Sequence, residues 1–184
     1  MSNNPWELYP HIWSTKSKFM SWIRSGLRNS LWSRSPIKLE FIKKYRKKIK
    51  NPKIRNLRNK AEIWGAECCI CGNDYPLNKI EVDHKIGNHS LRDISDIEPF
   101  IISIVIVNDD DIQLICKNCH QIKTHAEKYN ITFMEASRSK KIIAYGKLPV
   151  EKQKEILAEH NLPNSNAKIR KDGFIKIIDL LPLI

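Results

Sequence analysis

Two pairs of cysteines have the spacing that holds a metal ion. Cys68 and Cys71 form one Cys-x-x-Cys pair, and Cys116 and Cys119 form the other. Each pair can clamp one edge of a tetrahedral ion through two thiolates, at Zn–S distances of about 2.3 Å. Gly72, which follows Cys71, permits the tight turn that such a pair needs. The spacing therefore predicts a structural zinc site with four cysteine ligands.

One cysteine is left over, and one alternative stays open for the other four. Cys69 could replace Cys68 as a ligand only in a strained Cys-x-Cys chelate, so we expect Cys69 to be structural. The alternative for the whole set is reduced cysteine packed in a core, where this residue type is often buried. That alternative accounts poorly for the paired spacing.

His120 follows Cys119 directly and suggests a second site. Successive helical residues point about 100° apart, so a residue next to a zinc ligand faces another surface. Asp83 and His84 end the short run "IEVDH". Closure of both cysteine pairs on one ion would bring the segments that follow them together. Asp83 and His120 could then share a hard cation such as Mg²⁺, with water and phosphate oxygens completing its shell.

His84 follows Asp83 directly and could contribute to the same site. Neighbouring residues on a strand point to opposite faces, so His84 and Asp83 can serve one site only if the strand ends there. An imidazole with its ordinary pKa of about 6.5 can take a proton from water at neutral pH. Metal-assisted phosphodiester hydrolysis uses a general base close to a metal ion.

The elements that must position these residues are mainly helical. Helix starts are indicated by Ser14 and Thr15, by Ser35 with Pro36, and by a capping box of Thr132 with Glu135. A β-branched run before the second cysteine pair has the length of a helix, which favours a helix over a strand. The expected elements are helices over 14–32 and 35–50, a basic linker over 51–60, a strand over 79–84, and helices over 91–107, 117–129, 130–145, 149–160 and 165–181.

Positive charge is concentrated before the first cysteine. The chain of 184 residues has a formal net charge of +12. Residues 1–60 hold 16 Lys and Arg against two acids, a charge of +14, and residues 61–184 have −2. Such asymmetry is typical of a segment that binds nucleic acid. We therefore expect three parts: a basic helical DNA-binding arm (1–60), a core with the zinc site (61–130) and a C-terminal helical segment (131–184).

The string "CCICG…IEVDH…DDDIQLICKNCHQIKT", over residues 66–127, resembles the HNH endonuclease family with a four-cysteine zinc site. The resemblance implies an α+β fold, in which a small zinc-stapled ββα-metal core is flanked by helical segments. By position, Asp83 resembles the metal-binding Asp, His84 the general base, and His120 the metal ligand on the helix. The catalytic ion would be Mg²⁺ or Mn²⁺. The leading "PWELYPHIWSTKS" resembles, less specifically, phage-encoded HNH proteins that include free-standing homing endonucleases.

The chain departs from the family pattern at the middle position. Where the family has an Asn that bridges the loop by donating and accepting hydrogen bonds, this chain has Asp111, which only accepts when ionised. Asn108 could substitute for it if the loop shifts. His89 and His125 are expected in loop and surface positions, with a supporting role near phosphate or metal as the alternative.

DNA contacts are expected at both ends of the chain. Phosphate contacts by the basic arm would give an affinity that falls steeply with salt. The last two helices resemble a helix-turn-helix, with a plain helical hairpin as the alternative. The candidate contacts are Arg24, Arg28, Arg34, Lys43, Lys44, Arg46, Lys47, Lys48, Asn166, Lys168, Arg170 and Lys171.

Together these features predict a metal-dependent HNH DNA endonuclease that acts on double-stranded DNA, either homing or nicking. The alternatives are a non-catalytic zinc-bound DNA-binding protein, a restriction or defence HNH nuclease, and a nuclease that acts on RNA. One such site cuts one strand at a time, so a double-strand break would need a homodimer or two successive nicks. No apolar run is long enough to span a bilayer, and the N-terminus lacks the pattern of a secretory signal. We expect a cytoplasmic protein, encoded by a phage or mobile element in a bacterial host.

Overall fold

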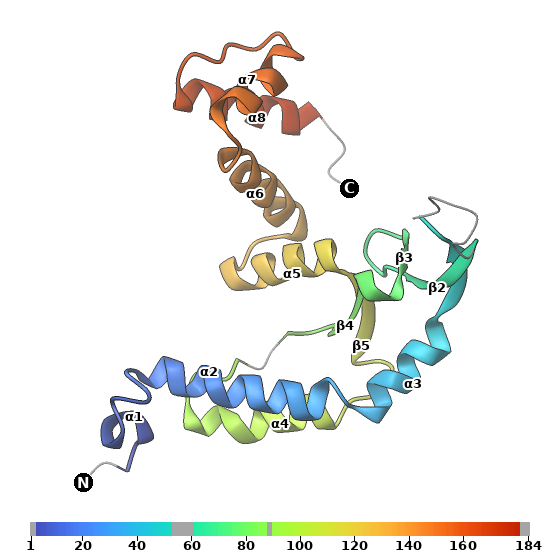
Figure 1. The fold of residues 1–184 in the computed structure, drawn as a ribbon, viewed down its shortest axis with the longest axis vertical. Helices are drawn as coiled ribbons and strands as arrows, with labels where there is room; N and C mark the ends of the chain where they lie inside the picture. The colour runs from blue at the N-terminus through green and yellow to red at the C-terminus, as the bar shows by residue number, and fades with distance from the viewer. Residues whose placement is uncertain (1–2, 53–60, 88–89, 181–184) are drawn as a thin grey trace. The chain divides into compact units, whose positions relative to one another are not determined.

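A computed structural model describes residues 3–52, 61–87 and 90–180. The fold is α+β, with helices and two small antiparallel sheets of three and two strands (Figure 1). The chain divides into two compact units, Met1–Cys116 and Lys117–Ile184. The elements of the first unit are α1 (Pro5–Leu8), α2 (Lys16–Leu27), η1 (Arg28–Trp32), α3 (Pro36–Tyr45), β1 (Lys47–Lys50), β2 (Glu62–Glu67), β3 (Asp74–Pro76), η2 (Leu77–Lys79), β4 (Ile80–His84), η3 (Ile94–Asp96), α4 (Ile97–Val105) and β5 (Ile112–Cys116).

Helix α2 begins at its predicted cap. The side chain of Thr15 accepts a hydrogen bond from the Lys18 backbone N–H at 3.3 Å. After Leu27 the helix continues as η1, a π-helical turn in which the Ser33 N–H donates to the Arg28 carbonyl, five residues earlier, at 2.9 Å. Helices α2 and α4 lie side by side (Figure 1). Their shared core contains Phe19 and Met20 of α2, Phe100 and Ile104 of α4, and Leu91, which precedes η3.

The predicted helix over 35–50 ends early. Ser35 caps α3 as expected, accepting from the Lys38 N–H at 3.4 Å. The prediction was wrong for Lys47–Lys50, which form strand β1, paired antiparallel with β2. The reason is packing: Ile49 is 7% exposed between two exposed lysines, and this alternation suits a strand rather than a helix.

Strand β2 is held closely on both sides. The sequence pattern predicts neither β2 nor β3. Gly65 of β2 lies opposite Lys47 in β1 and Pro76 in β3. A Cβ atom at Gly65 would lie 2.6 Å from the carbonyl oxygen of Tyr75 and would also overlap Ile49. The central strand of this sheet therefore needs glycine at this position.

The predicted strand "KIEVDH" is confirmed as β4, which pairs antiparallel with β5. Asp83 lies opposite Gln113, and His84, the last residue of β4, lies opposite Ile112. The face that carries Ile112 packs on the core of Phe41, Ala66, Val82, Val107, Ile112 and Leu114. The β-branched run is helical as predicted, since α4 occupies Ile97–Val105.

The second unit consists of α5 (Lys117–Tyr129), α6 (Phe133–Gly146), α7 (Val150–Ala158) and α8 (Ala167–Leu180). The predicted capping box is present at α6: Thr132 accepts from the Glu135 N–H, and the Glu135 carboxylate accepts from the Thr132 N–H. Asn166 caps α8 by accepting from the Ile169 N–H at 3.0 Å. Gly173 lets α8 approach α7, because a Cβ there would lie 3.0 Å from Leu157 Cδ2.

In the part of the chain that the structure describes, no helix combines the length and the apolar character needed to cross a membrane. The division into units also differs from the three parts expected from the sequence. Residues of the basic arm share their cores with residues 61–116, as Phe41 does with Val82 and Phe19 with Phe100.

Candidate functional site

The four paired cysteines converge. The sulfur atoms of Cys68, Cys71, Cys116 and Cys119 all lie within 4.8 Å of one another. Cys71 is half-buried and the other three are buried. A tetrahedron of thiolates around zinc has S–S edges of roughly 3.8 Å, because the Zn–S distance is about 2.3 Å. The cluster is thus a potential metal site, and four sulfur donors at this spacing fit a structural ion such as zinc.

The backbone around the first pair forms a tight turn toward the cluster. The Gly72 N–H donates to the Cys68 carbonyl at 2.9 Å, and Gly72 takes a positive φ of 68°. The Cys116 N–H donates to Cys68 Sγ at 3.3 Å. This hydrogen bond joins the first residue of each cysteine pair. The hydrogen bond with Cys71, together with burial, raises the pKa of the Tyr75 hydroxyl.

Cys69 lies outside the cluster. Its N–H donates to the Leu114 carbonyl at 2.9 Å, and its Sγ donates to Gln113 Oε1 at 3.3 Å. Both partners belong to β5. Cys69 therefore ties the cysteine turn to the strand that carries Cys116 into the cluster.

The His84 ring is held by two contacts. Its Nε2 lies 2.8 Å from the carbonyl oxygen of Ser103, and its ring is stacked on Trp32 with a centroid distance of 4.5 Å and an interplanar angle of 26°. A carbonyl oxygen only accepts, so Nε2 carries the proton, and the neutral ring has its lone pair on Nδ1. Ser103 is in the last turn of α4, where carbonyls lack partners within the helix.

Asp83 lies on the other face of β4 from His84, and the two can serve one site only because the strand ends at His84. Its carboxylate Oδ2 accepts a hydrogen bond from Gln113 Nε2 at 3.4 Å, across the strand pair. The side chain is half-buried. The Gln113 amide thereby links Asp83 with Cys69.

Asp111 closes the loop before β5. Its carboxylate accepts from the Asn108 N–H at 2.9 Å, and its own N–H donates to the Asn108 carbonyl at 3.1 Å. Its carbonyl accepts from the Lys85 N–H at 2.8 Å, just beyond the end of β4. The side-chain Oδ1 of Asn108 also accepts a hydrogen bond from the Asp110 N–H at 2.7 Å. Asp111 and Asn108 together hold the loop between α4 and β5 in place.

The remaining histidines have different surroundings. His120 is half-buried on α5, directly after Cys119, and its sharing of an ion with Asp83 stays a prediction. His125 has Nε2 3.3 Å from Ser139 Oγ and its ring 4.6 Å from Tyr129, so it joins α5 to α6. His89 lies outside the described residues.

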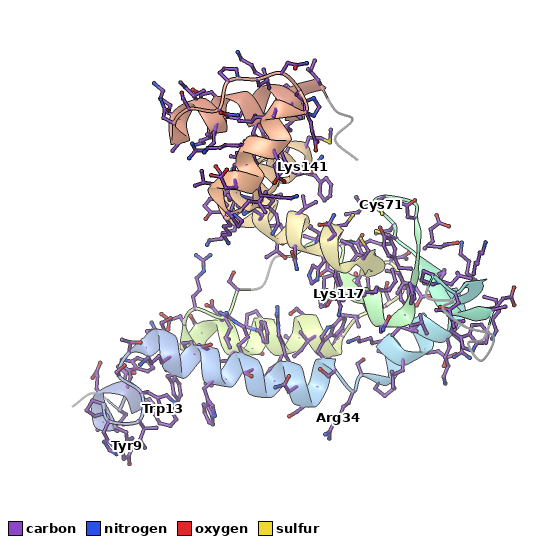
Figure 2. All side chains as sticks on the ribbon, turned by 45° about the horizontal axis from the view of Figure 1, so that its top comes forward. Tyr9, Trp13, Arg34, Cys71, Lys117 and Lys141 are labelled. Carbon is purple, nitrogen blue, oxygen red and sulfur yellow. The ribbon has the colours of Figure 1, made fainter. Side chains whose placement is uncertain are left out.

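Within residues 3–52, most of the candidate cations contact other residues of the first unit. Arg24 donates to the Leu91 carbonyl, and Arg28 lies 5.9 Å from the Phe100 ring. Arg34 is exposed and extends away from the ribbon (Figure 2). The other exposed candidates are Lys43, with a bond to Glu40; Lys44, paired with Asp109; Arg46 and Lys48, over Trp64; and Lys47, paired with Glu67 and Asp74.

The C-terminal candidates divide into two kinds. Lys168 and Lys171 are exposed on α8. Arg170 is only 8% exposed, and its guanidinium donates to Gln153 Oε1 and to the carbonyls of Asn164 and Ser165. The expectation that Arg170 contacts DNA is therefore corrected. Its buried guanidinium instead stabilises the connection between α7 and α8 through these hydrogen bonds.

Trp32, Ser103 and Gln113 surround the Asp83–His84 pair and are not expected from the sequence. Gln113 has a visible signal, since it is the polar residue in the otherwise apolar strand "IQLIC". Trp32 and Ser103 have none, because they reach His84 from helices distant in sequence.

The chain matches no family model, and the comparisons find no similar curated protein and no similar solved structure.

Proposed function

We propose that this protein is a metal-dependent HNH endonuclease that hydrolyses phosphodiester bonds in double-stranded DNA. One observation carries the proposal: a histidine with a fixed ring ends strand β4 directly after a half-buried carboxylate. The partner strand, β5, ends in the cysteine cluster. The resemblance in "IEVDH" and "ICKNCH" gives this arrangement its chemical meaning.

In the proposed reaction His84 takes the proton from the attacking water. The Ser103 carbonyl keeps the Nε2 proton in place, so the incoming proton goes to Nδ1. Asp83 and His120 would hold the catalytic ion. Mg²⁺ or Mn²⁺, when bound there, would stabilise charge on the phosphorane and on the leaving 3′ oxygen. Gln113 orients Asp83. Asp111 joins the loop before β5 to Lys85, the first residue after β4.

The four-cysteine site supports the proposal as a structural cross-link between segments. It fixes the start of α5, which carries His120, to the ends of the cysteine turn and of β5. Zinc there would have no part in the chemistry, because four thiolates fill its coordination shell.

DNA binding is assigned to exposed cations. Arg34 and Lys43 are exposed around α3, and Lys168 and Lys171 are exposed on α8. Contacts from these four side chains to phosphates release counterions, so the affinity should fall by about two powers of ten between roughly 50 and 200 mM salt. Arg170 and the part-buried Arg24 are left out of this set.

A specific feature favours the second candidate, a non-catalytic zinc-bound DNA-binding protein. Asp111 is acidic where the family has an amide, and an ionised carboxylate cannot donate the hydrogen bond that the amide gives. A restriction or defence nuclease shares the proposed chemistry and differs in its target.

The test is conversion of supercoiled plasmid to nicked or linear DNA by the full-length, zinc-loaded protein in Mg²⁺ or Mn²⁺. We expect cleavage by the wild type and none by His84→Ala. His125→Ala is the matched control, since His125 packs between two helices, and it should cleave normally. Tight, salt-sensitive binding without cleavage would support the non-catalytic candidate. Cutting at many short or modified sites, rather than at one long site, would indicate restriction or defence.

A further inference from the structure

Trp32 reaches His84 from an unusual turn of helix. In η1 the hydrogen bond from Ser33 to Arg28 spans five residues instead of four. The extra residue rotates the next part of the chain by about 100° relative to a continuous α-helix. Such π turns are less stable than α-helix and often serve functional sites. Here the turn ends in the tryptophan that stacks on His84.

Trp32 is itself firmly placed. It packs against the core that contains Phe41 and against the core that contains Phe100. Lys38 Nζ lies 5.2 Å from its ring centroid. The indole can therefore act as a fixed wall for the imidazole, rather than as a side chain that adapts to it.

We propose that Trp32 is a positioning residue, which sets the plane of the His84 ring for proton transfer. This inference rests on the proposed function. The hydrogen bond to Ser103 holds the Nε2 end of the imidazole. Stacking against Trp32, at an interplanar angle of 26°, holds the plane of the ring. The two contacts together define where Nδ1 points.

The consequence is that the basic arm belongs to the reaction centre as well as to DNA binding. Trp32 lies between Arg28 and Arg34, both exposed. Phosphate contacts by these arginines would act on the same turn that orients His84.

The first test separates rate from binding. Single-turnover cleavage of plasmid, with protein in excess and Mn²⁺ present, is compared with the plasmid dissociation constant. We expect Trp32→Ala to lower the rate roughly 10- to 100-fold, as misplacement of a reacting group does, with the dissociation constant within about twofold. Trp32→Phe, which keeps a flat ring, should recover most of the rate. Trp22→Ala is the matched control, since Trp22 is 60% exposed on α2. Zinc content and circular dichroism verify folding.

The second test does not depend on cleavage. In protein labelled with ¹⁵N-histidine, with His84→Gln used for assignment, we expect the Nε2–H tautomer and ring protons shifted upfield by the indole. Trp32→Ala should remove the shift and let the ring sample more than one orientation. If the wild type cleaves no DNA in either metal, the proposed function fails, and these spectra still decide what Trp32 does. Unchanged spectra in Trp32→Ala, or a cleavage rate equal to that of the wild type, would overturn the proposal.

Discussion

The buried Arg170 gives the most direct test of the second unit. We expect Arg170→Met to destabilise this unit by about 2–4 kcal/mol, because hydrogen bonds to charged groups contribute about 1.5–3 kcal/mol each. Three oxygens lose their donor: Gln153 Oε1 at 3.1 Å, and the carbonyls of Asn164 and Ser165 at 3.3 and 3.4 Å. Methionine fills a similar volume, so the loss reports the hydrogen bonds more than a cavity. A unit of about 70 residues has only about 3–10 kcal/mol in total.

Urea unfolding can report the two units separately. All five tryptophans lie in the first unit, at positions 6, 13, 22, 32 and 64. Tryptophan fluorescence therefore follows the first unit alone, whereas circular dichroism at 222 nm follows the helices of both. Arg170→Met should shift the dichroism transition to lower urea and leave the fluorescence transition in place.

Lys171→Met is the matched control, one residue further along α8 and exposed. It should change stability by less than about 0.5 kcal/mol and weaken salt-sensitive DNA binding instead. If Arg170→Met is as stable as Lys171→Met, the guanidinium does not hold the α7–α8 connection, and the reasoning from its burial is refuted.

Three further predictions concern the metal centre, the first sheet and a helix cap. Cys116→Ser should abolish binding of one zinc per chain, measured by elemental analysis after dialysis, whereas Cys69→Ser should retain the ion; equal loss in both would contradict the assignment of ligands. Gly65→Ala should lower the free energy of unfolding by about 1–3 kcal/mol, because its Cβ would overlap the next strand. Gly26→Ala, where a Cβ would meet open space, should raise it by up to about 1 kcal/mol. Chemical denaturation compares the two variants, and equal effects would refute the close approach of β3 to Gly65. The Thr132 backbone N–H, with its hydroxyl, lowers the pKa of Glu135, so the carboxylate stabilises the fold above its unfolded pKa and loses this effect as pH falls through the folded value. The stability difference between wild type and Glu135→Gln should therefore shrink below about pH 4, and a constant difference would argue against the capping box.

The sequence is informative where the signal is local. Helix caps at Thr15, Ser35 and Thr132 depend on the identity of neighbouring residues, and each is present. The two Cys-x-x-Cys pairs are also local signals, and a shared ion is the simplest way to join them. Their convergence agrees with that prediction.

The sequence is silent where the partner is distant. From the sequence alone, the residues of β1 resemble the end of a basic helix. Pairing with β2 makes them a strand, in which Ile49 is buried between exposed lysines. Likewise Arg170 resembles one more surface cation. Its burial results from how the α7–α8 connection folds back, and no periodicity in the sequence records that. The contacts of His84 with Trp32 and Ser103 belong to the same class.

The hydrogen bond from the Cys116 N–H to Cys68 Sγ joins residues that are 48 positions apart in the sequence. This separation has a consequence for synthesis on the ribosome. Helices α2 and α3 and strands β1 to β4 are all made before Ile112. The second strand of the β4–β5 pair and the third thiol of the cluster then emerge within five residues of each other. A nascent chain that stops before Ile112 has an unpaired β4 and half of the ligand set. Pairing of β5 with β4 and binding of an ion by the cysteine cluster should therefore occur at nearly the same time, late in the folding of the first unit.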